Sequence, residues 1–190
     1  MKRDVKNDIL EAGARLIHGQ GFNRTGLKEI LEAAGVPKGS FYFYFKSKEE
    51  FGLALIEHFS QVTSQARQAL ADQSLPPLAR LARFFALARE RFAAGGCGAG
   101  CPIGNLAQEM SDLSPAMRQA LSRSLAAMAG SLAKVLAEAV ELGEIQDVDP
   151  ARTAAFILDA WEGALLRMKT EKSVEPLLRF EDVVFNRLLR

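Results

Sequence analysis

Five consecutive aromatic residues, Phe41 to Phe45, constrain this chain of 190 residues more than any other stretch. An α-helix turns once in about 3.6 residues, so five adjacent rings point in every direction and one packed face cannot cover them all. Lys38-Gly39-Ser40 precedes the run, and Lys46-Ser47-Lys48 follows it. Rings left exposed among these cations indicate a surface that binds a partner, and the lysines favour an anionic partner such as DNA.

The segments before the run predict a helix-turn-helix. Thr25 is expected to cap a helix that Gly35 ends, and Pro37 suits the first turn of the next helix. Two short helices joined by about three residues with a glycine at the corner are typical of this motif. It presents its second helix, here the aromatic one, to the major groove of DNA.

Helical spacing of apolar residues continues along the chain and strand patterns are nearly absent, which predicts an all-α fold of roughly nine helices. Residues 1–46 are expected to form a helix-turn-helix domain and residues 47–190 a second helical domain. The capping-box pattern at Ser47 to Glu50 begins a long helix that bridges the two. The glycine-rich segment 95–102 is expected to be a loop, because glycines lose much backbone entropy in a helix.

The overall charge gives no independent support to DNA binding. The formal net charge is only +1, so any contact with nucleic acid has to come from a local basic surface. No apolar run approaches the length of about 20 residues that spans a membrane, and the start of the chain lacks an apolar signal segment. We therefore expect a cytoplasmic protein that does not enter a membrane.

Individual residues of the predicted helix-turn-helix have the chemistry that DNA contacts need. Lys38 and Gly39 lie at the helix start, which usually meets base edges, and Phe43 could touch a thymine methyl group. Hydroxyl groups and lysines suit phosphate contacts, which assigns that role to Thr25, Tyr42, Tyr44 and Lys48. On a helix Phe41, Tyr44 and Phe45 share a face and can anchor it, which leaves Tyr42 and Phe43 to face outward. The alternative, that the rings are core and the lysines only a solvated face, stays open from periodicity alone.

The second domain contains candidate residues for a ligand site. Its large apolar side chains either line a ligand site or form plain core; they are Phe85, Phe92, Met110, Met128, Trp161 and Leu165. Trp161-Glu162-Gly163 is the most suggestive group, since it sets an indole and a carboxylate beside a residue without a side chain.

Cys101 is the sharper feature, because Pro102 after it is a favoured first helical residue. An N-cap thiol there would be stabilised as a reactive thiolate by the helix dipole; the alternative is an inert small hydrophobe. The Cys97–Cys101 spacing lacks the further cysteines and nearby histidines of a metal site, so neither metal nor cofactor is expected. No histidine is placed to activate Cys101 as a catalytic nucleophile, and no catalytic residues are assigned. A cysteine-dependent enzyme and a purely structural helical module are the alternatives to a DNA-binding regulator.

Residues 22 to 53 resemble the DNA-binding domain of the TetR family of bacterial repressors. The shared features are Gly-Phe-x-x-Thr at Gly21 to Thr25, Ala34-Gly35-Val36, Lys38-Gly39-Ser40-Phe41-Tyr42, and Tyr44-Phe45-x-x-Lys48. The resemblance implies a homodimer that binds a near-palindromic double-stranded operator, and a C-terminal domain that binds a small-molecule effector and dimerises. It also implies base-edge roles for Lys38, Gly39 and Ser40. Relatives often carry His or Tyr at the position of Phe43, so this chain departs from the family pattern there.

Two C-terminal segments, Gly100 to Glu109 and Trp161 to Lys169, are similar to the TetR subgroup that responds to electrophiles and acrylate-type compounds. In some of these regulators a cysteine at the position of Cys101 is the sensor, which implies the same role here.

Overall fold

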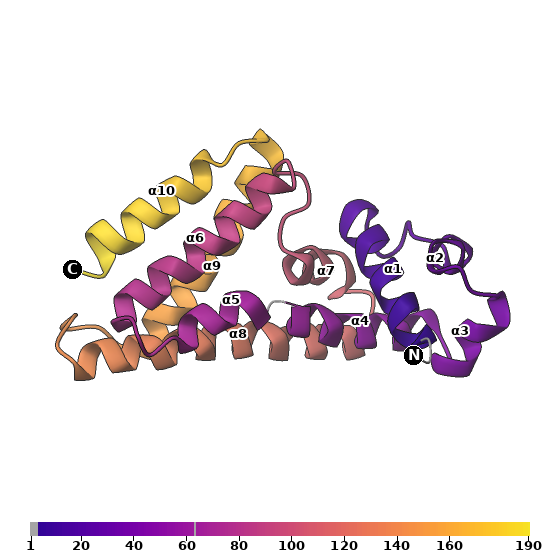
Figure 1. The fold of residues 1–190 in the computed structure, drawn as a ribbon, viewed down its shortest axis with the longest axis horizontal. Helices are drawn as coiled ribbons and strands as arrows, with labels where there is room; N and C mark the ends of the chain where they lie inside the picture. The colour runs from indigo at the N-terminus through magenta and orange to yellow at the C-terminus, as the bar shows by residue number, and fades with distance from the viewer. Residues whose placement is uncertain (1–3, 63) are drawn as a thin grey trace. The chain divides into compact units, whose positions relative to one another are not determined.

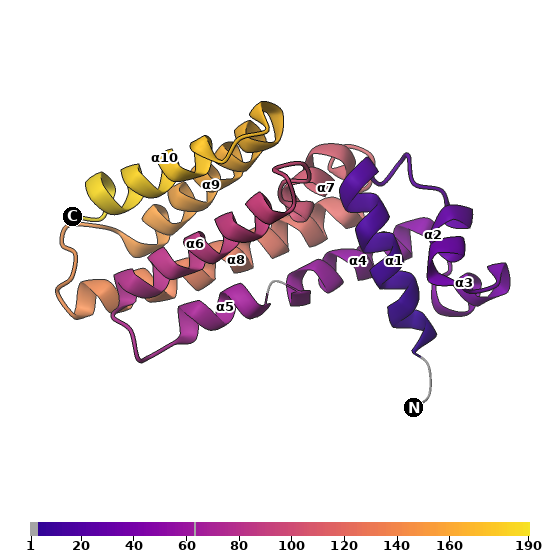
Figure 2. The same cartoon turned by 45° about the horizontal axis from the view of Figure 1, so that its top comes forward.

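The protein is all-helical in the computed structural model, which describes residues 4–62 and 64–190 (Figures 1 and 2). This confirms the predicted all-α class. The helices are α1 (Val5–Gln20), α2 (Leu27–Ala34), α3 (Lys38–Tyr44), α4 (Lys48–Val62), α5 (Ser64–Ala71), α6 (Pro77–Ala94), α7 (Pro102–Met110), α8 (Pro115–Glu141), α9 (Pro150–Glu171) and α10 (Glu175–Val183), with a π-helical turn at Val184–Leu188. The sequence prediction lacked α5. None of the described helices is long and apolar enough to cross a membrane.

The helices form two compact units that do not follow the predicted division at residue 46. One unit comprises the chain up to Val62 together with Pro102–Ser124. The other comprises the segment that ends at Cys101 and the segment Leu125–Arg190. Helices α4 and α7 and the first part of α8 therefore belong with the helix-turn-helix, in a unit made from two separate stretches of chain.

The helix ends of the helix-turn-helix show why the chain turns where it does. Gly35 adopts φ 64°, and Val36 N donates to Leu31 O at 3.1 Å, which closes α2 as predicted. Pro37 is the N-cap residue of α3 rather than its first helical residue. The expectation that Thr25 caps α2 is wrong: Gly26 is the N-cap, and the Thr25 hydroxyl donates to Gly21 O at 2.6 Å.

The capping box before α4 forms in a modified way. Ser47 Oγ accepts a hydrogen bond from Glu50 N at 3.0 Å, as the pattern predicts. The Glu50 carboxylate reaches one residue further back and accepts from Lys46 N at 2.8 Å. Both bonds fix the chain between the aromatic helix α3 and the start of α4.

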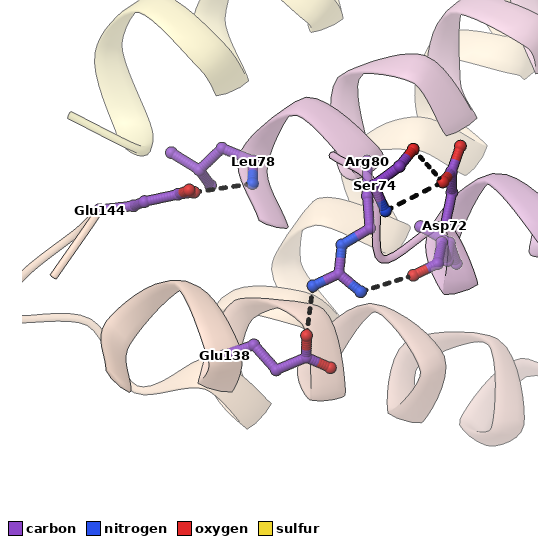
Figure 3. A network of polar contacts seen from close by, with 7 residues as sticks. Asp72, Ser74, Leu78, Arg80, Glu138 and Glu144 are labelled. Carbon is purple, nitrogen blue, oxygen red and sulfur yellow. Dashed lines mark hydrogen bonds and ion pairs between the residues drawn. The ribbon is translucent and has the colours of Figure 1, made fainter. Parts of the chain in front are cut away.

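A buried arginine organises the other unit (Figure 3). Arg80, on α6, is only 2% exposed, and its Nη1 donates to Leu70 O at 3.1 Å, at the end of α5. Its Nη2 pairs with the carboxylate of Glu138 on α8. Since a buried guanidinium is stable only when paired, Arg80 fixes α5 and α8 to α6. A second carboxylate, Glu144, accepts from Leu78 N at 2.9 Å and caps the start of α6.

Candidate functional site

The five aromatic residues from Phe41 to Phe45, at α3 and its C-cap, are divided between the core and the surface. Phe41 and Phe45 are 0% and 2% exposed, and their ring centroids lie 5.7 Å and 5.2 Å from that of Phe51. Tyr42 is 56% and Phe43 82% exposed. The predicted outward direction of Tyr42 and Phe43 is confirmed. Tyr42 and Phe43 are adjacent in the chain, and together they place aromatic area on the surface of this unit.

The start of α3 lies on the same open surface. Lys38 and Gly39 are exposed and Ser40 is half-buried, while Tyr44 at the other end is also half-buried. A Cβ at Gly39 would meet nothing within 4 Å, so a large partner can approach the backbone closely there. The first turn of α3 carries no acidic residue, and a negatively charged partner meets no repulsion from it.

Two residues predicted to contact phosphates bind the main chain in this structure: Thr25 is buried and Lys48 is half-buried. Thr25 is 0% exposed and its hydroxyl donates to Gly21 O, so it presents no atom to a phosphate in this conformation. Lys48 Nζ donates to Phe22 O at 2.6 Å and lies 4.7 Å from the centroid of the Phe22 ring. Burial lowers the pKa of Lys48, and Glu109 opposes the shift. Lys48 therefore holds the turn between α1 and α2.

The sequence did not predict the residue that holds this turn from its other side. The Glu109 carboxylate, on α7, accepts hydrogen bonds from Phe22 N and Asn23 N, both at 2.7 Å. The only hint was the position of Glu109 in a segment similar to a TetR subgroup.

The candidate effector residues are only partly brought together. Phe85 and Trp161 lie 5.0 Å apart between ring centroids, and Phe92 lies 6.5 Å from Trp161. Phe180, which the sequence did not single out, lies 4.9 Å from Phe85 and 5.0 Å from Trp161. Leu165 is buried and Met128 half-buried in the same unit, whereas Met110 is buried in the unit that holds the helix-turn-helix.

Cys101 directly precedes the first residue of α7, as predicted, but it is not an exposed thiol. It is 8% exposed and forms a hydrogen bond with the Glu162 side chain. Burial raises the pKa of Glu162, and the bond with Cys101 lowers it. A thiolate beside an ionised carboxylate would place two negative charges in contact, so this environment differs from the expected reactive thiolate.

Two further features mark the surroundings of Cys101. Glu162 Oε1 is buried without a hydrogen-bond partner among the described residues. Cys97, also buried, has φ 54°, a left-handed conformation that costs energy for a residue other than glycine. Neither cysteine takes part in a disulfide, and the described residues contain no cluster of His, Cys, Asp or Glu that could hold a metal ion.

Comparison with known proteins decides the family. Residues 9–55 match the family model described as "Bacterial regulatory proteins, tetR family", and residues 77–184 match "Tetracyclin repressor-like, C-terminal domain". The chain belongs to the TetR family. It is therefore a DNA-binding transcriptional regulator of the helix-turn-helix type.

The similar members of the family are named repressors and regulators. The chain is 39% identical to the transcriptional repressor DhaR of Mycobacterium sp., covering 97% of this chain and 92% of DhaR. It is 42% identical to the transcriptional regulator AcuR of Cereibacter sphaeroides, over 90% of this chain and 80% of AcuR. The repressor NemR of Escherichia coli is 32% identical over 93% of this chain and 89% of NemR.

Solved structures agree with this assignment. A regulatory protein TetR from Rhodobacter sphaeroides has a TM-score of 0.88 at 42% identity, over 95% of this chain and 96% of that one. The reduced form of E. coli NemR has a TM-score of 0.85 at 30% identity, over 97% of both chains.

Proposed function

We propose that the chain is a homodimeric repressor that binds a near-palindromic operator through α3 and releases it when a small-molecule or electrophilic effector acts near Cys101 and Trp161. The observation that carries the DNA contact is the exposure of Tyr42 and Phe43, since the neighbouring rings are buried or half-buried. Lys38 and Gly39 complete this surface, with Ser40 and Tyr44 at its edges. The protein acts as a regulator in the cytoplasm and not as an enzyme.

The surface of α9 supports a homodimer. Positions spaced alternately by three and four residues form one exposed stripe along this helix: Phe156, Asp159, Gly163, Leu166 and Thr170. Phe156 is 57% and Leu166 51% exposed, and a Cβ at Gly163 would meet nothing within 4 Å. Leu178 and Val183 add exposed apolar area on α10, which packs against α9. Two copies of this face would bury these side chains in a two-fold bundle.

The surroundings of Cys101 support an effector that acts on the thiol. The Glu162 carboxylate in contact with it can accept the thiol proton when sulfur bonds to an electrophilic carbon. The reduced form in which NemR was solved is consistent with thiol chemistry in a relative. The rings of Phe85, Phe92 and Trp161 offer an apolar boundary for such a molecule.

Fluorescence anisotropy with the DNA upstream of the protein's own gene tests the DNA contact. We expect the parent to bind at low salt and the Tyr42→Ala, Phe43→Ala double variant to bind about tenfold or more weakly, with unchanged helicity. Leu142→Ala, at a site 70% exposed in the other unit, is the control and should bind like the parent. Equal binding by the double variant would refute the assignment of α3.

Adding N-ethylmaleimide to the DNA complexes tests the thiol. We expect the parent and Cys97→Ser to release DNA and Cys101→Ser to retain it. Equal release by all three proteins would show that Cys101 is not the sensor.

A further inference from the structure

We infer that Glu109 is a positioning residue for DNA binding, because its carboxylate fixes the turn between α1 and α2 that places the helix-turn-helix. This inference rests on the proposed function. The contact consists of the Glu109 carboxylate and the main-chain N–H groups of Phe22 and Asn23, and we refer to it as the Glu109 latch. Each carboxylate oxygen accepts one N–H at 2.7 Å. Such charge-assisted bonds are about twice as strong as neutral ones.

Two main-chain carbonyls of the turn are also bound by side chains. Lys48 Nζ donates to Phe22 O at 2.6 Å, and the Thr25 hydroxyl donates to Gly21 O at 2.6 Å. The Phe22 side chain is 3% exposed, and a Cβ at Gly52 of α4 would come within 2.9 Å of its ring. The turn is thus fixed by its ring, by Lys48 of α4 and by Glu109 of α7. Because α2 follows directly, the turn sets where α2 and then α3 begin.

This contact explains a carboxylate at position 109 and adds a second reason for a glycine at position 21. Glu109 lies in the last turn of α7, where the partial negative charge of a helix C-terminus disfavours a carboxylate. Two N–H donors and the nearby Lys48 ammonium offset that cost. Gly21 has φ 92°, and a Cβ there would lie 3.2 Å from Glu109 Oε2. A side chain at position 21 would therefore be strained and would also press on the carboxylate.

Neighbouring contacts join α7 and the start of α8 to the same part of the unit. Asn23 Nδ2 donates to Met110 Sδ at 3.5 Å. Ser114, whose Oγ accepts from Met117 N at 3.1 Å at the start of α8, also donates its hydroxyl to Glu49 of α4. Helix α7, which carries Glu109, begins directly after Cys101 in the chain.

The decisive variant is Glu109→Gln. A positioning role predicts that this substitution weakens DNA binding, whereas electrostatics alone predicts that it strengthens DNA binding. Removing a negative charge near a DNA-binding surface ordinarily strengthens binding to DNA. A glutamine oxygen cannot replace both carboxylate oxygens, so loss of the latch should weaken binding to the upstream DNA by about tenfold. Glu32→Gln is the matched control: Glu32 is 68% exposed on α2 and pairs with Lys28, and this variant should bind as well as the parent or better.

Amide hydrogen exchange measured by NMR tests the latch without DNA. The amides of Phe22 and Asn23 should be protected in the parent and should exchange about tenfold faster in Glu109→Gln, while the amide of Ile17 keeps its rate. Glu109→Asp, which keeps the charge on a shorter side chain, should give an intermediate rate and intermediate DNA affinity. A mere loss of stability would raise exchange throughout α1 instead of at these two amides.

The outcomes separate this inference from the proposed function. Unprotected Phe22 and Asn23 amides in the parent, or unchanged exchange in Glu109→Gln, would overturn the latch whether or not the protein binds DNA. Tighter DNA binding by both Glu109→Gln and Glu32→Gln would overturn the role of the Glu109 latch in positioning the helix-turn-helix. If the parent itself does not bind the upstream DNA, the proposed function fails and the positioning role fails with it, while the exchange rates still decide whether the latch forms.

Discussion

The aromatic residues of α3 and those of the α6–α9–α10 cluster are placed in opposite ways. On α3 the rings are consecutive, and the helical turn sends Phe41 into the core and leaves Phe43 82% exposed. In the cluster, Phe85, Trp161 and Phe180 come from three different helices and meet with centroids about 5 Å apart. Consecutive rings on a short helix are thus divided between the core and the surface, whereas rings from three helices can pack against one another.

The polar residues beside the two groups differ as well. Near α3, the Lys48 ammonium binds the Phe22 carbonyl of the α1–α2 turn. Beside Trp161, Glu162 leaves one carboxylate oxygen buried without a hydrogen-bond partner among the residues that the structure describes. The second group therefore retains a polar atom that a bound molecule can satisfy.

The largest expected effect separates the two faces of α3. Phe41→Ala should lower the free energy of unfolding by about 3–5 kcal/mol, because the site cannot collapse around Phe45 and Phe51. Phe43→Ala should change it by less than about 0.5 kcal/mol, since that ring contacts mainly solvent. Chemical denaturation followed by circular dichroism measures both. Equal losses would mean that Phe43 is part of the core and that the division of the rings is wrong.

A smaller effect is expected from glycines that differ in the space around them. A Cβ at Gly13 would lie 2.4 Å from Phe51 Cζ, and Phe51 is fully buried against the rings of Phe41 and Phe45. Gly13→Ala should therefore destabilise the protein by about 1–3 kcal/mol through overpacking. At Gly130 of α8 a Cβ would meet nothing within 4 Å, so Gly130→Ala should stabilise by about 0.5–1 kcal/mol. The Tm of Gly13→Ala should fall below that of the parent and the Tm of Gly130→Ala should rise above it. A change in the same direction for both variants would contradict this prediction.

The smallest effect concerns Glu162 in the second group. Because burial raises the pKa of Glu162 in the folded protein, the folded state keeps this proton to a higher pH than the unfolded chain does. Its contribution to stability is therefore fully present below about pH 4.3 and is lost as pH rises through the raised pKa. Relative to Glu162→Gln, the parent should lose stability as pH rises from that value. Parallel curves of unfolding free energy against pH for the two proteins would show that Glu162 ionises normally.

Local patterns in the sequence predicted most of the fold. Gly35, Ser47 and the loop before Pro102 carry their signals within a few residues, and the structure has these helix ends where the patterns indicate. The helical period also predicted which rings of α3 face outward. These features depend on neighbours along the chain, which a single sequence displays.

Contacts between distant segments could not be predicted in this way. Thr25 and Lys48 have the chemistry of phosphate ligands, and only the fold shows that both bind main-chain carbonyls of the α1–α2 turn. Glu109 and Arg80 looked like ordinary charged residues of amphipathic helices, because their partners lie far away in the sequence. Phe180 was missed for the same reason, since its ring contacts depend on how α10 packs.

The discontinuous N-terminal unit has a consequence for building chimeric regulators. A designer who grafts the DNA-reading segment of this protein onto a foreign sensor, cutting after α3 or α4, would leave behind α7 and the start of α8. The transplanted α1–α2 turn would then keep Lys48 but lose the acceptor for the Phe22 and Asn23 amides. To move the DNA-sequence specificity of this protein to another regulator, a designer should therefore transfer residues 102–124 together with the N-terminal segment. The alternative is to replace only the exposed side chains of the corresponding helix in the intact recipient protein.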